Sequence, residues 1–247
     1  MKNKSHKRLS VITILLAATM LAILSGCSVS TASYNLGIVE RRSFEVSDFT
    51  AIETSLPFRI TWQESTETTV TIEMHENLFS RISVTENNGT LVIRPNRTIV
   101  GSHNQWESPR LYITSPYIAG ITAYGAIRVE NWDTVVADSF SLDLNGGATI
   151  NLDLEVENLD INVNGGSSIT LSGTATSTDI SLAGGINLSA LALETQDTSI
   201  DIVGSGNIYI TAYNTLNVTA TGAARVRYGG NPNVTRRIIG AGTVRRA

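Results

Sequence analysis

The second half of the chain alternates apolar and polar residues with a strict period of two. The pattern is Ser-Leu-Asp-Leu at 141–144, Asp-Ile-Asn-Val at 160–163 and Asp-Ile-Ser-Leu at 179–182. This period is typical of a β-strand with one buried face. We therefore expect strands in this half, with aliphatic side chains inside and Asp, Asn and Ser outside.

Small-residue clusters interrupt the alternation at nearly constant intervals. Their central glycines are Gly125, Gly146, Gly165, Gly184, Gly204, Gly222 and Gly240, separated by 21, 19, 19, 20, 18 and 18 residues. The fourth residue after each of these glycines is Val, Ile or Leu. Glycine inside a strand marks a bend or a close backbone approach, so the seven glycines are expected to be structural corners.

A repeat of about 20 residues is typical of architectures in which each unit buries its apolar face only against its neighbours. The sequence therefore predicts an all-β protein, a single-chain parallel β-helix or β-solenoid with coils of about 19 residues.

The first half contains strand patterns without the glycine repeat. Strands are expected at 58–63, 69–74, 81–86, 90–95 and 109–116, with a polar loop at 98–108. Asn88 and Gly89 both tolerate positive φ and predict a hairpin between two of these strands. We expect this part to start or cap the solenoid, because an open sheet end needs cover.

The amino terminus has the features of an export signal. Four basic residues precede the apolar run Val11–Leu24, which is followed by small residues. The run is shorter than the roughly 20 residues that cross a bilayer as a helix, so residues 1–26 are expected to be a signal peptide.

Leu24-Ser25-Gly26-Cys27 resembles the lipobox of bacterial lipoproteins and contains the chain's only cysteine. The resemblance implies cleavage between Gly26 and Cys27, and acylation of Cys27 that anchors the protein to the lipid bilayer. An ordinary signal peptide is the alternative. The expected organisation is a signal peptide at 1–26, a lipidated tether at 27–43 and a β domain at 44–247. The expected location is the cell membrane, or the outer membrane or cell surface in a Gram-negative cell.

Charge limits the partners. The chain has 18 basic and 22 acidic residues, and loss of the signal leaves 14 basic and 22 acidic residues. This acidic balance argues against nucleic acid, which is bound by neutralising phosphates. Six arginines nevertheless lie in the last 23 positions. They indicate either a solvated basic end or a patch for phosphate or acidic glycan.

The chain resembles the head GIN domain family of putative autotransporter adhesins from about Phe44 to Arg246. The resemblance rests on FTAIETSLPFRITWQ at 49–63, GTLVI at 89–93, RLYITSP at 110–116, ITAYGA at 121–126, the glycine doublets and IGAGTVRR at 239–246. Ser55-Leu56-Pro57 departs from the glycine-proline pair common in the family. The family implies a β-solenoid and an envelope or surface location.

No recognisable catalytic motif occurs in the sequence, which has no CxxC, HExxH or Walker glycine loop. We expect no catalytic residues, no metal and no cofactor, and we interpret His75 and His103 as surface residues. The best enzyme candidates are the outward aspartates Asp143, Asp160, Asp179 and Asp201, which could bind calcium through their oxygens. Trp106 and Trp132 are the tryptophans best placed to stack on a sugar.

The leading hypothesis is a non-enzymatic envelope lipoprotein whose rigid β structure presents a surface for adhesion or for binding a glycan or protein. One alternative is a structural or scaffolding envelope protein with a stable protein partner. Another is a β-helical enzyme that degrades polysaccharide through the outward aspartates.

Overall fold

The computed structural model describes residues 36–97, 108–130 and 133–247 of the chain. The predicted signal peptide, Gly26, Cys27 and most of the tether lie outside these residues, as do His103, Trp106 and Trp132. The described residues belong to one compact unit. None of the helices in the described ranges is long and apolar enough to cross a membrane.

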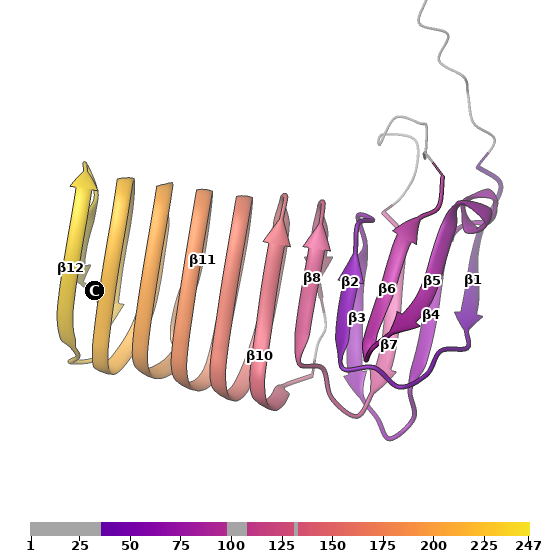
Figure 1. Ribbon diagram of the computed structural model, residues 1–247, viewed down its shortest axis with the longest axis horizontal. Helices are drawn as coiled ribbons and strands as arrows, with labels where there is room; N and C mark the ends of the chain where they lie inside the picture. Colours follow the sequence, from indigo (N-terminus) through magenta and orange to yellow (C-terminus); the bar gives the residue numbers. More distant parts are fainter. Residues whose placement is uncertain (1–35, 98–107, 131–132) are drawn as a thin grey trace, which may run out of the picture. The chain divides into compact units, whose positions relative to one another are not determined.

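The described chain is almost entirely β-structure, with one short 3₁₀ helix (Figure 1). The elements are β1 (Val39–Phe44), β2 (Ala51–Thr54), β3 (Arg59–Glu64), β4 (Thr69–His75), η1 (Glu76–Arg81), β5 (Ile82–Asn87), β6 (Thr90–Pro95), β7 (Arg110–Ser115), β8 (Gly120–Tyr124), β9 (Ile127–Val129), β10 (Val135–Asn145), β11 (Ala148–Gly229), β12 (Asn233–Gly240) and β13 (Thr243–Arg246).

The all-β prediction is confirmed, but the predicted class, a parallel β-helix or solenoid of about 19-residue coils, is wrong. The strands form one 13-stranded sheet that curves around one core as a nearly closed barrel. Eleven strands follow the order β1-β4-β7-β3-β9-β11-β10-β8-β2-β6-β5, and β12 and β13 each pair with β11. Three pairs, β1–β4, β4–β7 and β5–β6, are antiparallel, and the other pairs are parallel. The antiparallel strands are therefore part of the same wall and not a separate cap on a parallel structure.

The glycine period is reflected in the register of the parallel strands. Val135 of β10 pairs with Leu154 of β11, Thr215 of β11 pairs with Asn233 of β12, and Arg225 pairs with Thr243 of β13. Partners are thus 18 or 19 residues apart. Figure 1 shows β11 winding repeatedly, so that stretches of this one long strand lie side by side.

The alternation places the aliphatic residues in the core, as the pattern predicts. Leu142, Leu144, Ile161 and Val163 are each at most 1% exposed, while the intervening polar side chains face outward. Burial of each such side chain contributes about 1.5–3 kcal/mol. The core of this half consists of repeated aliphatic positions.

The seven repeat glycines all have positive φ, between 116° and 147°. A Cβ built on Gly184 would lie 2.3 Å from the carbonyl oxygen of Gly165 in the neighbouring winding. Gly185, in contrast, has no atom within 4 Å of such a Cβ. The first glycine of this doublet is therefore required by both backbone conformation and space, whereas the second is not.

The first half has a core of larger side chains. Phe58, Trp62 and Phe79 are at most 7% exposed, and Phe79 comes from η1. The predicted hairpin is confirmed: β5 and β6 are antiparallel, and Asn88 and Gly89 have φ of 52° and 77°.

Candidate functional site

A row of arginines crosses five neighbouring strands of the first half. The register pairs Arg41 of β1 with Glu73 of β4, and Glu73 with Arg110 of β7. It then pairs Arg110 with Arg59 of β3, and Arg59 with Arg128 of β9. We call Arg41, Arg110, Arg59 and Arg128, with Glu73 and Glu130, the arginine row. The pairing places three arginines on adjacent strands.

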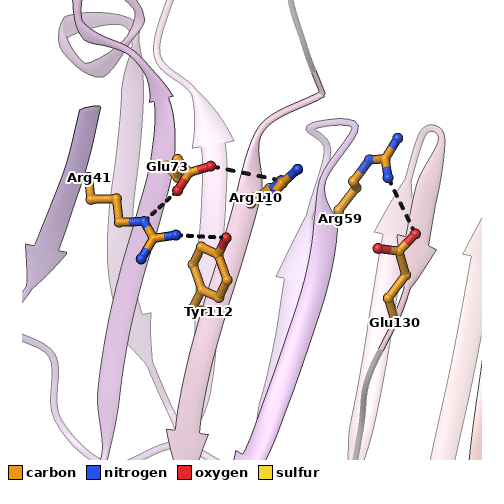
Figure 2. Close-up of polar contacts among 6 residues, drawn as sticks. All are labelled: Arg41, Arg59, Glu73, Arg110, Tyr112 and Glu130. Carbon is orange, nitrogen blue, oxygen red and sulfur yellow. Dashed lines mark hydrogen bonds and ion pairs between the residues drawn. The ribbon is translucent and has the colours of Figure 1, made fainter. Parts of the chain in front are cut away.

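Two glutamates, Glu73 and Glu130, form ion pairs with the arginines of the row (Figure 2). Glu73 accepts a hydrogen bond from Arg41 Nε and has an oxygen 3.8 Å from Arg110 Nε. Glu130, just after β9, has an oxygen 3.5 Å from both Arg59 Nη1 and Arg128 Nε. Each glutamate is thus shared by two arginines.

Tyr112 extends the contacts of Arg41. Arg41 Nη2 donates a hydrogen bond to the Tyr112 hydroxyl at 3.3 Å, and the guanidinium carbon lies 4.8 Å from the ring centroid. The hydrogen bond and charge of Glu73 raise the pKa of Arg41. Arg41 therefore contacts both Glu73 and Tyr112 although its side chain is exposed.

The row contains more positive than negative charge, with four arginines and two glutamates. Arg59, Arg110 and Arg128 have side chains 43%, 48% and 50% exposed. Neighbouring strands lie about 4.8 Å apart, and like charges opposite each other in a sheet are destabilising. The arrangement can therefore attract an anion from solvent.

A cleft of about 280 Å³ adjoins the row. Arg59 and Arg128 form part of its lining, together with Phe58, Thr149 and the small residues Gly147, Ala148 and Gly166. Because the small residues leave the backbone accessible, a ligand can come close to the sheet here.

The same outward position continues across β11 with neutral polar residues. Thr149 pairs with Arg128, and the corresponding positions in later windings are Ser168, Asn187 and Asn207. All four are exposed, and Asn207 Nδ2 donates a hydrogen bond to Asn187 Oδ1 at 3.1 Å. Charged donors are therefore followed along one line by uncharged ones.

The outward aspartates form no comparable site. Asp160 pairs with Ser141, Asp143 pairs with Asn162, and Asp160 accepts a hydrogen bond from Asn162 Nδ2 at 2.7 Å. Asp160 and Asp179 line a second cleft, of about 350 Å³. Within the ranges that the structure describes, no group of three or more His, Cys, Asp or Glu residues could hold a metal ion.

The other candidates lie apart from the arginine row. His75 is half-buried, and its Nδ1 lies 3.0 Å from the Gly37 carbonyl oxygen. All six arginines near the carboxyl end are exposed. Arg236 also pairs with the buried Val218 and donates a hydrogen bond to the Val244 carbonyl oxygen at 3.1 Å. Arg236 therefore lies over the end of the core.

Sequence reasoning missed the arginine row. Its members are spread from residue 41 to residue 130 and lie on strands whose spatial order differs from their order in the chain. The available signal was that each arginine occupies an outward position of an alternating strand. Only the strand order shows that these positions are neighbours.

Comparisons agree with this architecture. Residues 48–232 match the sequence profile of a family described as putative auto-transporter adhesin, head GIN domain. A solved structure of a putative adhesin from Bacteroides fragilis superposes with a TM-score of 0.78, at 21% identity over 85% of this chain and 97% of that one.

Two further solved structures have TM-scores of 0.62. One is a putative adhesin from Parabacteroides merdae at 18% identity, and the other a putative lipid binding protein from Parabacteroides distasonis at 17%. Each match spans 85% of this chain and 97% of the chain in the solved structure. At these identities the structures share the fold, and no curated protein matches the sequence.

Proposed function

The chain belongs to the putative auto-transporter adhesin, head GIN domain family, and from this membership we propose that it is a non-enzymatic adhesion protein of the cell envelope. The observation that carries the proposal is the arginine row with its polar continuation. It is a long outward line of hydrogen-bonding groups on a sheet whose inner face is fixed by a packed core. Such a rigid surface suits binding without chemical conversion, because little side-chain order has to be gained on contact.

We propose further that Cys27 anchors the protein to the membrane. The support is the sequence Leu24-Ser25-Gly26-Cys27 after an apolar run. Several acyl chains on one cysteine give stable attachment, since each buried methylene contributes about 0.8 kcal/mol. Mass spectrometry of the membrane-extracted protein should find an acylated Cys27 at the amino terminus. A mature amino terminus elsewhere would contradict the anchor.

The adhesion role is tested with cells that display the full-length protein. Attachment to host cells or to a glycan-coated surface should be saturable and should be inhibited by the purified protein in solution. Cells that display the Arg59→Gln/Arg128→Gln variant at equal density are the matched control for the surface involved. Attachment equal to that of cells without the protein would contradict the proposed function.

The scaffolding alternative requires a protein partner at a sheet edge. Val234 and Ile239 of β12 are 37% and 52% exposed, which favours a contact there. Arg236 on the same strand is, however, an exposed charge at the position aligned with the buried Val218, and charges on an edge strand oppose the addition of further strands. Crosslinking on intact cells separates the hypotheses, because a scaffold predicts one stoichiometric protein partner.

A further inference from the structure

We propose that the arginine row and the adjoining cleft bind a linear acidic glycan, with the carboxylate or sulfate groups of its sugars on the guanidinium groups. This inference rests on the proposed adhesion function and names the ligand class for it. It concerns Arg110, Arg59 and Arg128 in particular, which the register places on three successive strands.

The spacing favours a polymer with a regular repeat. The strands are separated by about 4.8 Å, close to the length of one sugar residue in a linear chain. Acidic groups on successive sugars can therefore meet successive arginines. Guanidinium groups bind carboxylate and sulfate with paired, charge-assisted hydrogen bonds.

The two glutamates position the guanidinium groups without cancelling their charge. Glu130 lies 3.5 Å from both Arg59 and Arg128, and Glu73 contacts both Arg41 and Arg110. One carboxylate for each pair of arginines leaves an excess of two positive charges over the row. A bound polyanion would relieve the repulsion between neighbouring arginines.

The surroundings favour a sugar over other polyanions. The cleft beside Arg59 and Arg128 has a floor of small residues that a sugar ring can approach. Beyond it, Thr149, Ser168, Asn187 and Asn207 offer neutral hydroxyl and amide groups along the same line. Sugar hydroxyls pair with such groups, whereas nucleic acid requires many more basic contacts than a chain of net charge −4 provides.

The test measures binding of defined oligosaccharides to the mature full-length protein in detergent by isothermal titration calorimetry. The probes are a heparin-derived octasaccharide and an oligogalacturonate, with maltooctaose as the neutral comparison. We expect binding of at least one acidic probe that weakens with added salt, and no binding of maltooctaose. Equal binding of maltooctaose, or no binding of either acidic probe, would overturn the inference.

Two double variants carry the same change in charge at different places. Arg59→Gln/Arg128→Gln should weaken binding at least about tenfold, because hydrogen bonds to charged groups are lost. Arg237→Gln/Arg245→Gln, at the carboxyl-terminal end, should leave the affinity within about twofold. If both weaken binding equally, the attraction is nonspecific and the row is not the site.

Glu130→Gln provides a test of opposite sign. Removing this carboxylate increases the positive charge of the row and should tighten binding up to about fivefold, the worth of an exposed ion pair. An unchanged or weaker affinity would contradict attraction of the ligand by the net charge of the row and would count against the inference. Circular dichroism of each variant ensures that the comparison is made between folded proteins.

The outcomes also separate this inference from the proposed function. If cells that display the Arg59→Gln/Arg128→Gln variant attach as strongly as wild-type cells, the ligand assignment is overturned and the adhesion role is retained. Row-dependent glycan binding without any cell attachment would do the reverse. Binding of the row to phosphatidylglycerol vesicles, but to neither acidic oligosaccharide, would assign it to anionic lipid and overturn the glycan.

Discussion

The residues before Val129 and those after Val135 surround one core, but they do so in different ways. The first part combines antiparallel and parallel strands and packs aromatic side chains such as Phe58 and Trp62. The second part repeats aliphatic positions in parallel windings and bends at glycines with positive φ. The repeated part is uniform along its length, whereas the non-repeating part contains the arginine row. The repeated part therefore contributes a regular core, whereas the non-repeating part contributes a surface that differs from the rest.

The outer strands β1 and β12 each contain an exposed arginine at a position that the register aligns with the core. Arg42 of β1 pairs with the buried Ile72, and its guanidinium carbon lies 4.3 Å from the centroid of the Phe79 ring. Arg236 of β12, which pairs with the buried Val218 of β11, occupies the matching kind of position. Charges on an edge strand discourage edge-to-edge pairing, so the two parts solve this problem in the same way despite their different cores.

The largest effect is expected from removing an aromatic side chain in the first part. Trp62 is 1% exposed, and its Nε1 donates a hydrogen bond to Ser115 Oγ at 2.8 Å. Trp62→Ala should lower the free energy of unfolding by about 3–5 kcal/mol, measured by urea denaturation. Trp62→Phe is the control and should cost less. A loss below about 1 kcal/mol for the alanine variant would contradict the single-core description.

The glycine doublet at 184 and 185 tests whether the bends of the second part require glycine. Gly184→Ala should lower the free energy of unfolding by about 3 kcal/mol, because it combines a left-handed φ of 126° with a Cβ 2.3 Å from a carbonyl oxygen. Gly185→Ala, with no atom near its Cβ, should change it by less than about 0.5 kcal/mol. Equal effects in denaturation curves would refute the distinction between the two glycines.

Substitutions of buried threonines in the second part are expected to change the free energy of unfolding by a smaller amount. Thr195 Oγ1 donates a hydrogen bond to the Thr211 carbonyl oxygen at 2.8 Å, and its hydroxyl also contacts that of Thr198. Thr195→Val should therefore destabilise by about 1–3 kcal/mol. Thr178 is 1% exposed and its Oγ1 has no hydrogen-bond partner among the described residues, so Thr178→Val should be neutral or stabilising. Thermal denaturation distinguishes the two, and a destabilised Thr178→Val would indicate an unseen partner.

The smallest effect on unfolding is expected at the carboxyl-terminal edge. Arg236→Leu should leave the free energy of unfolding nearly unchanged but promote self-association, because it replaces an exposed charge over the end of the core with an apolar side chain. Light scattering after size-exclusion chromatography measures the change. Arg237→Leu is the control, because Arg237 pairs with the outward-facing Thr219. This variant should show the same association state as the wild type. Association of both variants alike would show that added hydrophobicity alone is responsible.

The mixed sheet has no direct signature in the pattern of apolar and polar residues. The period of two predicts strands and their buried faces, and the hairpin at Asn88-Gly89 follows from local conformational preference. The direction of pairing between distant strands such as β4 and β7 is not encoded in either pattern. The prediction of a parallel solenoid that the first strands start or cap is therefore wrong, because β1, β4 and β7 pair antiparallel within the same sheet.

The sequence by itself determined the strands, their inner faces and the places where glycine is needed, because each depends on residues close together in the chain. The tertiary structure alone decided which strands are neighbours, and so brought Arg41, Arg110, Arg59 and Arg128 into one row. The order of strands in a sheet depends on the packing of the whole core, and the sequence of a single segment does not determine it. A surface assembled from distant segments is therefore recognised only once the chain is folded.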